Sequence, residues 1–204
     1  MLGLRGAWLT GWARLGRTIT IAALCLYGLP AAANEPTVKI STALGDIIVA
    51  IDATHAPVTA ANFLRYVDQK LYDGGAFHRT VRLDNQPTSD IRIEVIQAGI
   101  NPGLESREFA AIPLERTNQT GLKHLAGTIS MARDGPDTAT SDFFICVTDQ
   151  PSLDFGGQRN PDGQGFGAFG RVLSGMEVVR RIQLSKAQGQ TLAPAVRILS
   201  IRRQ

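Results

Sequence analysis

Short β-rich segments separated by glycine and proline turns are the feature that most limits what this chain can fold into. About eight such segments follow residue 34, and all of them are short. Many short strands joined by turns are typical of a closed β-barrel or a sandwich. The expected strands are Thr37–Ser41, Asp46–Asp52, Ala76–Arg82, Ile91–Ala98, Gly127–Ala132, Asp142–Thr148, Phe166–Leu173 and Ala195–Ile201.

Only two stretches carry apolar residues at helical spacing. The first begins at Pro57, where the first turn of a helix tolerates proline, and runs to about Lys70. The second is Met176–Leu184. Two helices are too few to cover both faces of a parallel sheet, so the pattern predicts a mainly β fold and disfavours an α/β fold.

The first 33 residues resemble a secretory signal peptide, which leaves 34–204 as one folded domain. Arginine is the only charged residue type in residues 1–33, the uncharged run Thr18–Leu29 follows, and Ala31–Ala33 offers a cleavage site. We therefore expect export to the periplasm, with no stable membrane insertion after cleavage. The alternative is an uncleaved membrane anchor, but this run is shorter than the roughly 20 residues that span a bilayer.

The charge balance and the motifs exclude several functions. Three of the 21 basic residues lie in residues 1–33, and the other 18 equal the 18 acidic residues, so we expect no nucleic-acid partner. His55, His78 and His124 lie far apart without a zinc motif, so we expect no metal. Gly165–Gly170 matches the GxGxxG pattern, but a polar loop precedes it and a strand runs through it, unlike a dinucleotide site.

Three segments carry the most specific pattern. They are Phe77–Val81 with Val95–Gly99, then Gly127–Arg133, then Ser141–Cys146. In this order, with Phe169–Val172 downstream, they resemble the cyclophilin family of peptidyl-prolyl cis-trans isomerases, over about Thr37 to Ile201. The resemblance implies a closed eight-stranded antiparallel barrel capped by two α-helices. It also implies Pro-containing or unfolded polypeptides as substrates and no cofactor. We expect a bacterial, exported member that acts as a monomer.

The resemblance makes Arg79 the catalytic residue. Prolyl isomerisation breaks no covalent bond, and its barrier of roughly 18–20 kcal/mol comes from amide resonance. In the twisted state the amide nitrogen gains a lone pair, to which a guanidinium can donate a hydrogen bond that the planar amide cannot accept. From residue spacing alone, Arg79 could equally be a solvated surface charge.

The same resemblance assigns the substrate-binding residues. Gln97 would bond the substrate backbone, Phe144 would form the floor of the proline pocket, and Leu153 its aliphatic wall. Without the resemblance, Phe144 and Val95 would be read as ordinary barrel core. The full predicted set is Val95, Gln97, Ala132, Arg133, Phe144, Leu153 and Phe166, with Ala132 and Arg133 meeting the substrate through their backbone.

The chain departs from the family pattern around the pocket's outer wall. The stretch Arg82–Glu94 is longer than usual. Several pocket positions carry unusual residues: Glu94 for a Phe, Val95 for a Met, Ser152 for a Trp, Phe166 for a His and Asp142 for a Gln. Two functions therefore stay open, an isomerase and a non-catalytic module that holds Pro-containing segments. The retained Arg79 favours the isomerase, because a pure binder needs no donor to the amide nitrogen.

Overall fold

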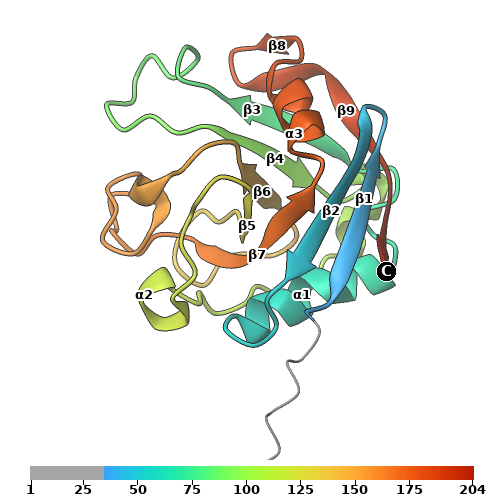
Figure 1. Cartoon of the computed structure of the whole chain (residues 1–204), viewed down its shortest axis with the longest axis horizontal. Coiled ribbons are helices and arrows are strands. Elements are labelled where there is room, and N and C mark those ends of the chain that lie inside the picture. Colours follow the sequence, from blue (N-terminus) through green and yellow to red (C-terminus); the bar gives the residue numbers. More distant parts are fainter. Residues whose placement is uncertain (1–34) are drawn as a thin grey trace, which may run out of the picture. The chain divides into compact units, whose positions relative to one another are not determined.

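The strands of this protein close into a barrel. In a computed structural model, which describes residues 35–204, eight antiparallel strands hydrogen-bond in the order β1-β2-β7-β5-β6-β4-β3-β9, and β9 returns to β1 (Figure 1). The predicted signal peptide lies outside the described residues. The barrel strands are β1 Thr37–Thr42, β2 Gly45–Ile51, β3 Ala76–Val81, β4 Val95–Gly99, β5 Thr128–Met131, β6 Phe143–Cys146, β7 Gly167–Ser174 and β9 Thr191–Arg203.

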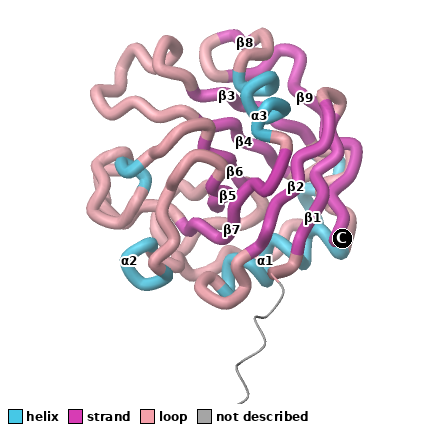
Figure 2. Tube along the Cα trace, in the orientation of Figure 1, coloured by secondary structure: helices cyan, strands magenta, loops and turns pink. Residues whose placement is uncertain are grey.

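Two helices lie at opposite ends of the barrel (Figures 1 and 2). Helix α1, Pro57–Asp68, begins at its proline and packs on β7 and β9. Helix α3, Met176–Gln183, packs on β2, β3 and β4. The prediction of a barrel capped by two helices is confirmed. None of the helices formed by residues 35–204 is long and apolar enough to cross a membrane.

The short elements were not foreseen from the sequence. They are the two-residue strand β8, Ala187–Gln188, the helix α2, Thr117–Thr120, and the 3-10 turns η1, Pro102–Arg107, and η2, Pro151–Leu153. Strand β8 forms a short hairpin with the first residues of β9. Four residues are too few for a helical pattern to show in the sequence.

One predicted strand begins later than expected. Residues 91–94 were assigned to a strand, but β4 starts at Val95, and the preceding residues belong to a loop that leaves the sheet. Their alternating apolar residues suggested a strand. In the fold that alternation instead places Ile93 against a pocket outside the barrel and Glu94 away from it.

Strands β4 and β6 bury both of their faces. Ile96, Ala98, Phe143 and Ile145 point into the barrel and join the main core. Val95, Phe144 and Cys146 belong to a second apolar cluster with Leu153 and Ile93, on the outside of the barrel. A strand covered on both sides is apolar at nearly every position, and in β4 only the half-buried Gln97 departs from this. The uninterrupted Phe143–Cys146 run is therefore the sequence trace of an external pocket.

Candidate active site

The second cluster forms the floor of a cleft of about 380 Å³ on the outer face of the barrel. All eight residues predicted from the sequence line it: Arg79, Val95, Gln97, Ala132, Arg133, Phe144, Leu153 and Phe166. The structure thus brings together side chains from β3, β4, β6 and β7's leading loop that lie up to 87 positions apart in the chain. Their individual roles toward a substrate remain predictions.

Strand register places the central residues in one row. Arg79 of β3 pairs with Gln97 of β4, and Gln97 pairs in turn with Phe144 of β6. Directly opposed side chains on neighbouring antiparallel strands lie within contact distance. A cation, an amide and an aromatic ring are therefore set side by side across the outer face.

A β-bulge at His78 aims Arg79 outward. Between Phe77 and Arg79 the pairing of β3 shifts by one residue against β4 and by three residues against β9. In a regular strand residues i and i+2 share a face, which would direct Arg79 into the barrel beside the buried Phe77. The extra residue reverses that alternation, a common use of bulges next to active sites.

Two glutamines hold the guanidinium of Arg79. Its Nε and Nη2 donate to Oε1 of Gln190 at 2.9 and 2.6 Å, and its Nη1 donates to Oε1 of Gln97 at 3.0 Å. Burial lowers the pKa of Arg79 below its ordinary value, but an arginine starts so high that it stays protonated at neutral pH. The cleft thus contains a fixed positive charge held by neutral amides.

The apolar floor is built around Phe144. Its ring stacks on His124 at 5.9 Å between centroids and meets Phe166 edge-on at 5.4 Å. His124 is itself fixed, because its two ring nitrogens contact Asp154 and Ser130 at 2.8 and 3.0 Å. The floor is therefore a rigid aromatic surface, sized for a small apolar ring.

The side chain of Arg133 supports the cleft from below its rim. It donates to both carboxylate oxygens of Asp162, at 2.7 and 2.9 Å, and to the Gly165 carbonyl, and its guanidinium lies 5.0 Å from the Phe166 ring centroid. These hydrogen bonds lower the pKa of Asp162 to about 2. The engaged side chain fixes the segment around Gly165 at the cleft; that the Arg133 backbone meets a substrate stays a prediction.

The long Arg82–Glu94 stretch forms the outer wall of the cleft. It places Ile93, only 6% exposed, against the apolar floor. Glu94 points elsewhere and bonds Thr148 and Gln183. From the sequence, Glu94 falls where the family usually has a Phe in the pocket. In the structure, Ile93 makes the apolar contact with the cleft floor instead. Only the alternation of Ile91, Ile93 and Val95 could have indicated it.

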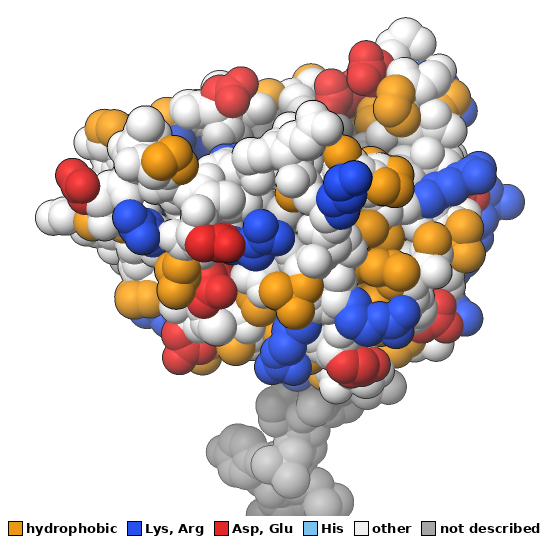
Figure 3. Space-filling model, turned by 90° about the horizontal axis from the view of Figure 1, so that it is seen from above, with side chains coloured by type: hydrophobic (Ala, Val, Ile, Leu, Met, Phe, Trp, Pro, Cys, Tyr) orange, Lys and Arg blue, Asp and Glu red, His pale blue; other side chains and the backbone are white. Residues whose placement is uncertain are grey.

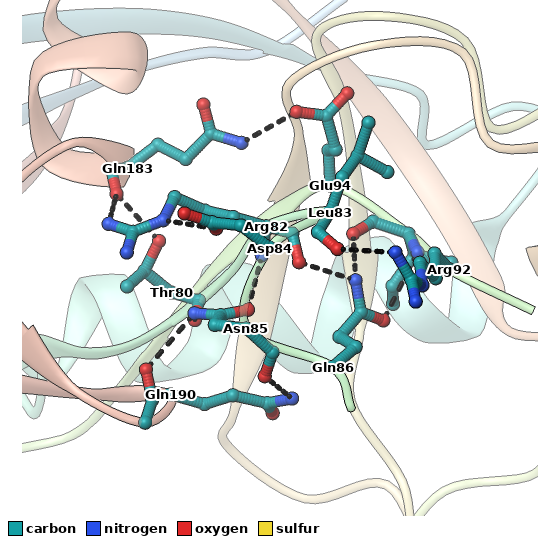
Figure 4. Close-up of polar contacts among 12 residues, drawn as sticks. Thr80, Arg82, Leu83, Asp84, Asn85, Gln86, Arg92, Glu94, Gln183 and Gln190 are labelled. Atoms are coloured by element: carbon teal, nitrogen blue, oxygen red, sulfur yellow. Dashed lines mark hydrogen bonds and ion pairs between the residues drawn. The ribbon is translucent and has the colours of Figure 1, made fainter. Parts of the chain in front are cut away.

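Two polar side chains hold this wall in place. Buried Gln86 bonds the Arg82 and Ile93 carbonyls through its Nε2, at 2.7 and 2.8 Å, and accepts the Ile93 N–H (Figure 4). Arg159, which also lines the cleft, donates to Ser89 Oγ and to the Ile91 carbonyl at 2.7 and 2.6 Å. Neither residue was identified from the sequence, because their partners are mostly backbone carbonyls, which every residue has, and only the folded loop presents these to them.

Asp142 extends the row of polar residues behind Gln97. Its Oδ2 accepts the Gln97 amide at 2.9 Å and lies 3.5 Å from Nε2 of His78. Burial raises the pKa of the Asp142 carboxyl, while the Gln97 hydrogen bond and His78 oppose that rise. A side chain at Gly99 would collide with this carboxylate. Glycine there leaves room for the contact.

No other chemistry is apparent within residues 35–204. That part of the chain has no group of three His, Cys, Asp or Glu side chains that could hold a metal ion. Cys146 is fully buried, and its burial raises the thiol pKa, which disfavours the reactive thiolate. On the face shown in Figure 3, described basic and acidic side chains alternate with apolar ones.

Comparisons with known proteins agree with this geometry. Residues 37–203 match the family model described as cyclophilin-type peptidyl-prolyl cis-trans isomerase/CLD. The chain is 35% identical to peptidyl-prolyl cis-trans isomerase A of Dickeya dadantii, over 88% of this chain and 87% of that protein. It is 33% identical to isomerase B of Escherichia coli, over 72% and 83% respectively.

A solved structure supports the fold. A cyclophilin-type isomerase of Cryptosporidium parvum, crystallised in the presence of the dipeptide Ala-Pro, superposes with a TM-score of 0.66 and 21% identity. The match covers 82% of this chain and 98% of that one. At this identity the similarity concerns the barrel alone.

Replacing Gln86 by Leu should loosen the outer wall without unfolding the barrel. The change leaves the Ile93 carbonyl and N–H without the partner that Gln86 gives them, and each unpaired buried group costs about 1–3 kcal/mol; the Arg82 carbonyl still accepts the Asn85 N–H. Amide hydrogen exchange should become faster for Ile93 and its neighbours, while Ile129 and Ile145 stay protected. Thr88→Ala, at an exposed position of the same loop, is the control. Equal protection of Ile93 in both variants would show that Gln86 does not hold the wall.

Proposed function

The chain belongs to the cyclophilin-type peptidyl-prolyl cis-trans isomerase family, and we propose that it accelerates rotation about X-Pro amide bonds in exported bacterial polypeptides, assisting their folding. The isomerase activity follows from the family and from homologues of that name over most of the chain. The observation that carries the mechanism is the guanidinium of Arg79, held beside an apolar pocket.

The pocket lowers the barrier by binding the twisted amide better than either planar form. Proline enters the apolar space between Phe144, Leu153 and Ile93, where little water is left to stabilise the polar planar amide. Rotation then makes the prolyl nitrogen pyramidal and gives it a lone pair. No proton transfer is needed, so the reaction requires no general base.

Arg79 recognises that lone pair. Three of its five N–H groups are occupied by the two glutamines, which leaves two for the substrate in a fixed direction. A preorganised donor of this kind stabilises a transition state by a few kcal/mol in a water-poor site. Because its partners are neutral, the positive charge of Arg79 stays available to the developing lone pair.

The N-terminal segment supports the proposal of export. Residues 1–33 combine arginine as the only charged residue type, a twelve-residue uncharged run and the small residues Ala31–Ala33. Such segments direct secretion and are then removed. The Pro-containing segments of polypeptides that fold after crossing the membrane would be the substrates, and the periplasm the compartment.

Replacing Arg79 by Ala should reduce kcat/KM at least tenfold, a loss of about 1.4 kcal/mol of transition-state stabilisation. Exchange spectroscopy on a short Pro peptide measures the rate directly, and an unchanged melting temperature would exclude unfolding. Arg79→Lys, which keeps the charge but loses the fork, should recover little. A wild-type protein that binds the peptide without accelerating exchange would instead be the non-catalytic binding module.

Isomerase activity should fall on the acidic side and stay flat above it. The Asp142 carboxylate fixes Gln97 and has a raised pKa, so its proton is taken up at a higher pH than for an ordinary aspartate. Below that pKa the Gln97 amide loses its charged acceptor, and a protonated oxygen that donates can face it instead, so the amide can turn away from Arg79. Asp142→Asn keeps an acceptor that does not titrate, so its pH–rate profile should lose the acidic limb.

The pH–rate profile of Asp142→Asn can also contradict this prediction. His78 on β3, Glu108 after η1 and buried Tyr72 also face Asp142, and all three remain in the Asp142→Asn variant. An acidic limb that is unchanged in this variant would show that Asp142 does not cause it. At neutral and higher pH, Arg79 stays protonated, so neither protein should show a second limb there.

The natural protein should begin at or near Asn34 after export. The reason is the Ala31–Ala33 cleavage site that follows the apolar run. N-terminal sequencing of protein purified from the periplasmic fraction measures this directly. A chain that begins at Met1 and sediments with the membranes would contradict cleavage and favour the anchor.

A further inference from the structure

We infer that Gln190 is a positioning residue, which fixes the direction of the Arg79 guanidinium and ties it to the base of the Arg82–Glu94 loop. The inference rests on the isomerase function proposed above. Gln190 lies outside every motif that carries the family resemblance and does not line the cleft. It contacts the Nε and Nη2 edge of the Arg79 guanidinium, whereas Gln97 contacts Nη1.

The first support is the contact itself. One amide oxygen, Oε1 of Gln190, accepts from both Nε and Nη2 of Arg79, at 2.9 and 2.6 Å. These two donors form one edge of the planar guanidinium, so a shared acceptor there sets the plane of the whole group. Gln97 makes a single bond to the group, through Nη1, and could not by itself prevent rotation.

The second support is that the Gln190 amide can adopt only one orientation. Its Nε2 donates to the Asn85 carbonyl at 3.3 Å while its oxygen faces Arg79. If the amide turned over, two donors would face the guanidinium and an oxygen would face a carbonyl, so both contacts would become repulsive. Gln97 is held in the same manner, with its Nε2 on Asp142. Each glutamine is thus locked by a partner on its far side.

The third support is the local backbone. Gln190 follows Gly189 in the two-residue turn between β8 and β9, and Gly189 has a φ of 59°. Glycine at the first position suits such tight hairpin turns. The Gln190 carbonyl also accepts the Thr80 N–H, next to Arg79 in the chain. A tight turn docked on β3 gives the Gln190 side chain a fixed origin.

These contacts connect Arg79 to the outer wall. Asn85 donates from Nδ2 to the Thr80 and Gly189 carbonyls, at 3.0 and 3.1 Å, and accepts the Arg82 N–H (Figure 4). The residue that holds Gln190 is therefore also the anchor where the loop leaves β3. The loop that supplies Ile93 to the pocket and the turn that orients Arg79 form one hydrogen-bonded unit.

The test compares variants of the full mature chain, assayed for kcat and KM on one Pro peptide. Gln190→Met has nearly the same size without the acceptor, and Gln190→Glu keeps an acceptor for both N–H groups. The control is Gln188→Met, at an exposed position in the same hairpin. We expect kcat to fall about tenfold in Gln190→Met, because a small misplacement of a catalytic group is costly, with KM nearly unchanged. Gln190→Glu should recover only part of that loss, because its carboxylate orients the guanidinium but competes with the substrate for the positive charge.

A spectroscopic readout isolates the positioning role. The Nε–H of Arg79 should exchange faster with water in Gln190→Met than in the wild type, and be protected again in Gln190→Glu. Wild-type kcat in a folded Gln190→Met protein would overturn the inference. So would equal losses in kcat and in melting temperature that Gln190→Glu fails to recover. If the wild type itself is inactive, the proposed function fails, and Nε–H exchange then decides the positioning alone.

Discussion

The burial of β4 and β6 on both faces is the constraint on which the rest of this structure depends. Inside the barrel their side chains join the main core, and outside it Val95, Phe144 and Cys146 form the cleft floor. Because the same two strands form part of the core and the floor of the cleft, the floor is as rigid as the core. A pocket that must favour a twisted amide needs that rigidity, since its selectivity comes from shape fixed before the substrate arrives.

Arg79 stands at the edge of this surface through a local exception. The bulge at His78 turns it outward, where a regular strand would have buried it beside Phe77. Two neutral amides then fix the guanidinium without neutralising it. A carboxylate in either place would hold the group as well, but would compete with the substrate for its charge. Acid–base groups are not needed, because amide rotation moves no proton.

The outer wall is where this protein differs from the pattern of its family. Positions that usually carry large aromatic or imidazole side chains hold Glu94, Ser152 and Phe166, and the longer loop supplies Ile93 instead. Gln86 and Arg159 fold that loop through bonds to its backbone. The wall is thus built from a different segment, around a floor that keeps Phe144.

The sequence by itself determined the class of fold, the two capping helices and the residues of the cleft. These predictions rest on local patterns: period-2 alternation for the strands, Pro57 for the start of a helix, and the apolar run Phe143–Cys146 for a strand buried on both faces. Such patterns depend on local geometry and burial, so neighbouring residues are enough to reveal them. The sequence also carried the motifs by which the chain resembles its family, and these motifs contain Arg79, Gln97 and Phe144. Only the tertiary structure decided that Glu94 turns away while Ile93 enters the pocket, and that Gln86, Arg159 and Gln190 support the site. Gln190 and Arg159 act through hydrogen bonds to groups 111 and 70 positions away in the chain. Gln86 bonds groups only four and seven positions away, but the shape of the folded loop is what brings them to its side chain. Such contacts leave no local pattern, because a polar side chain on a loop has the same sequence signature whether it meets water or a buried partner.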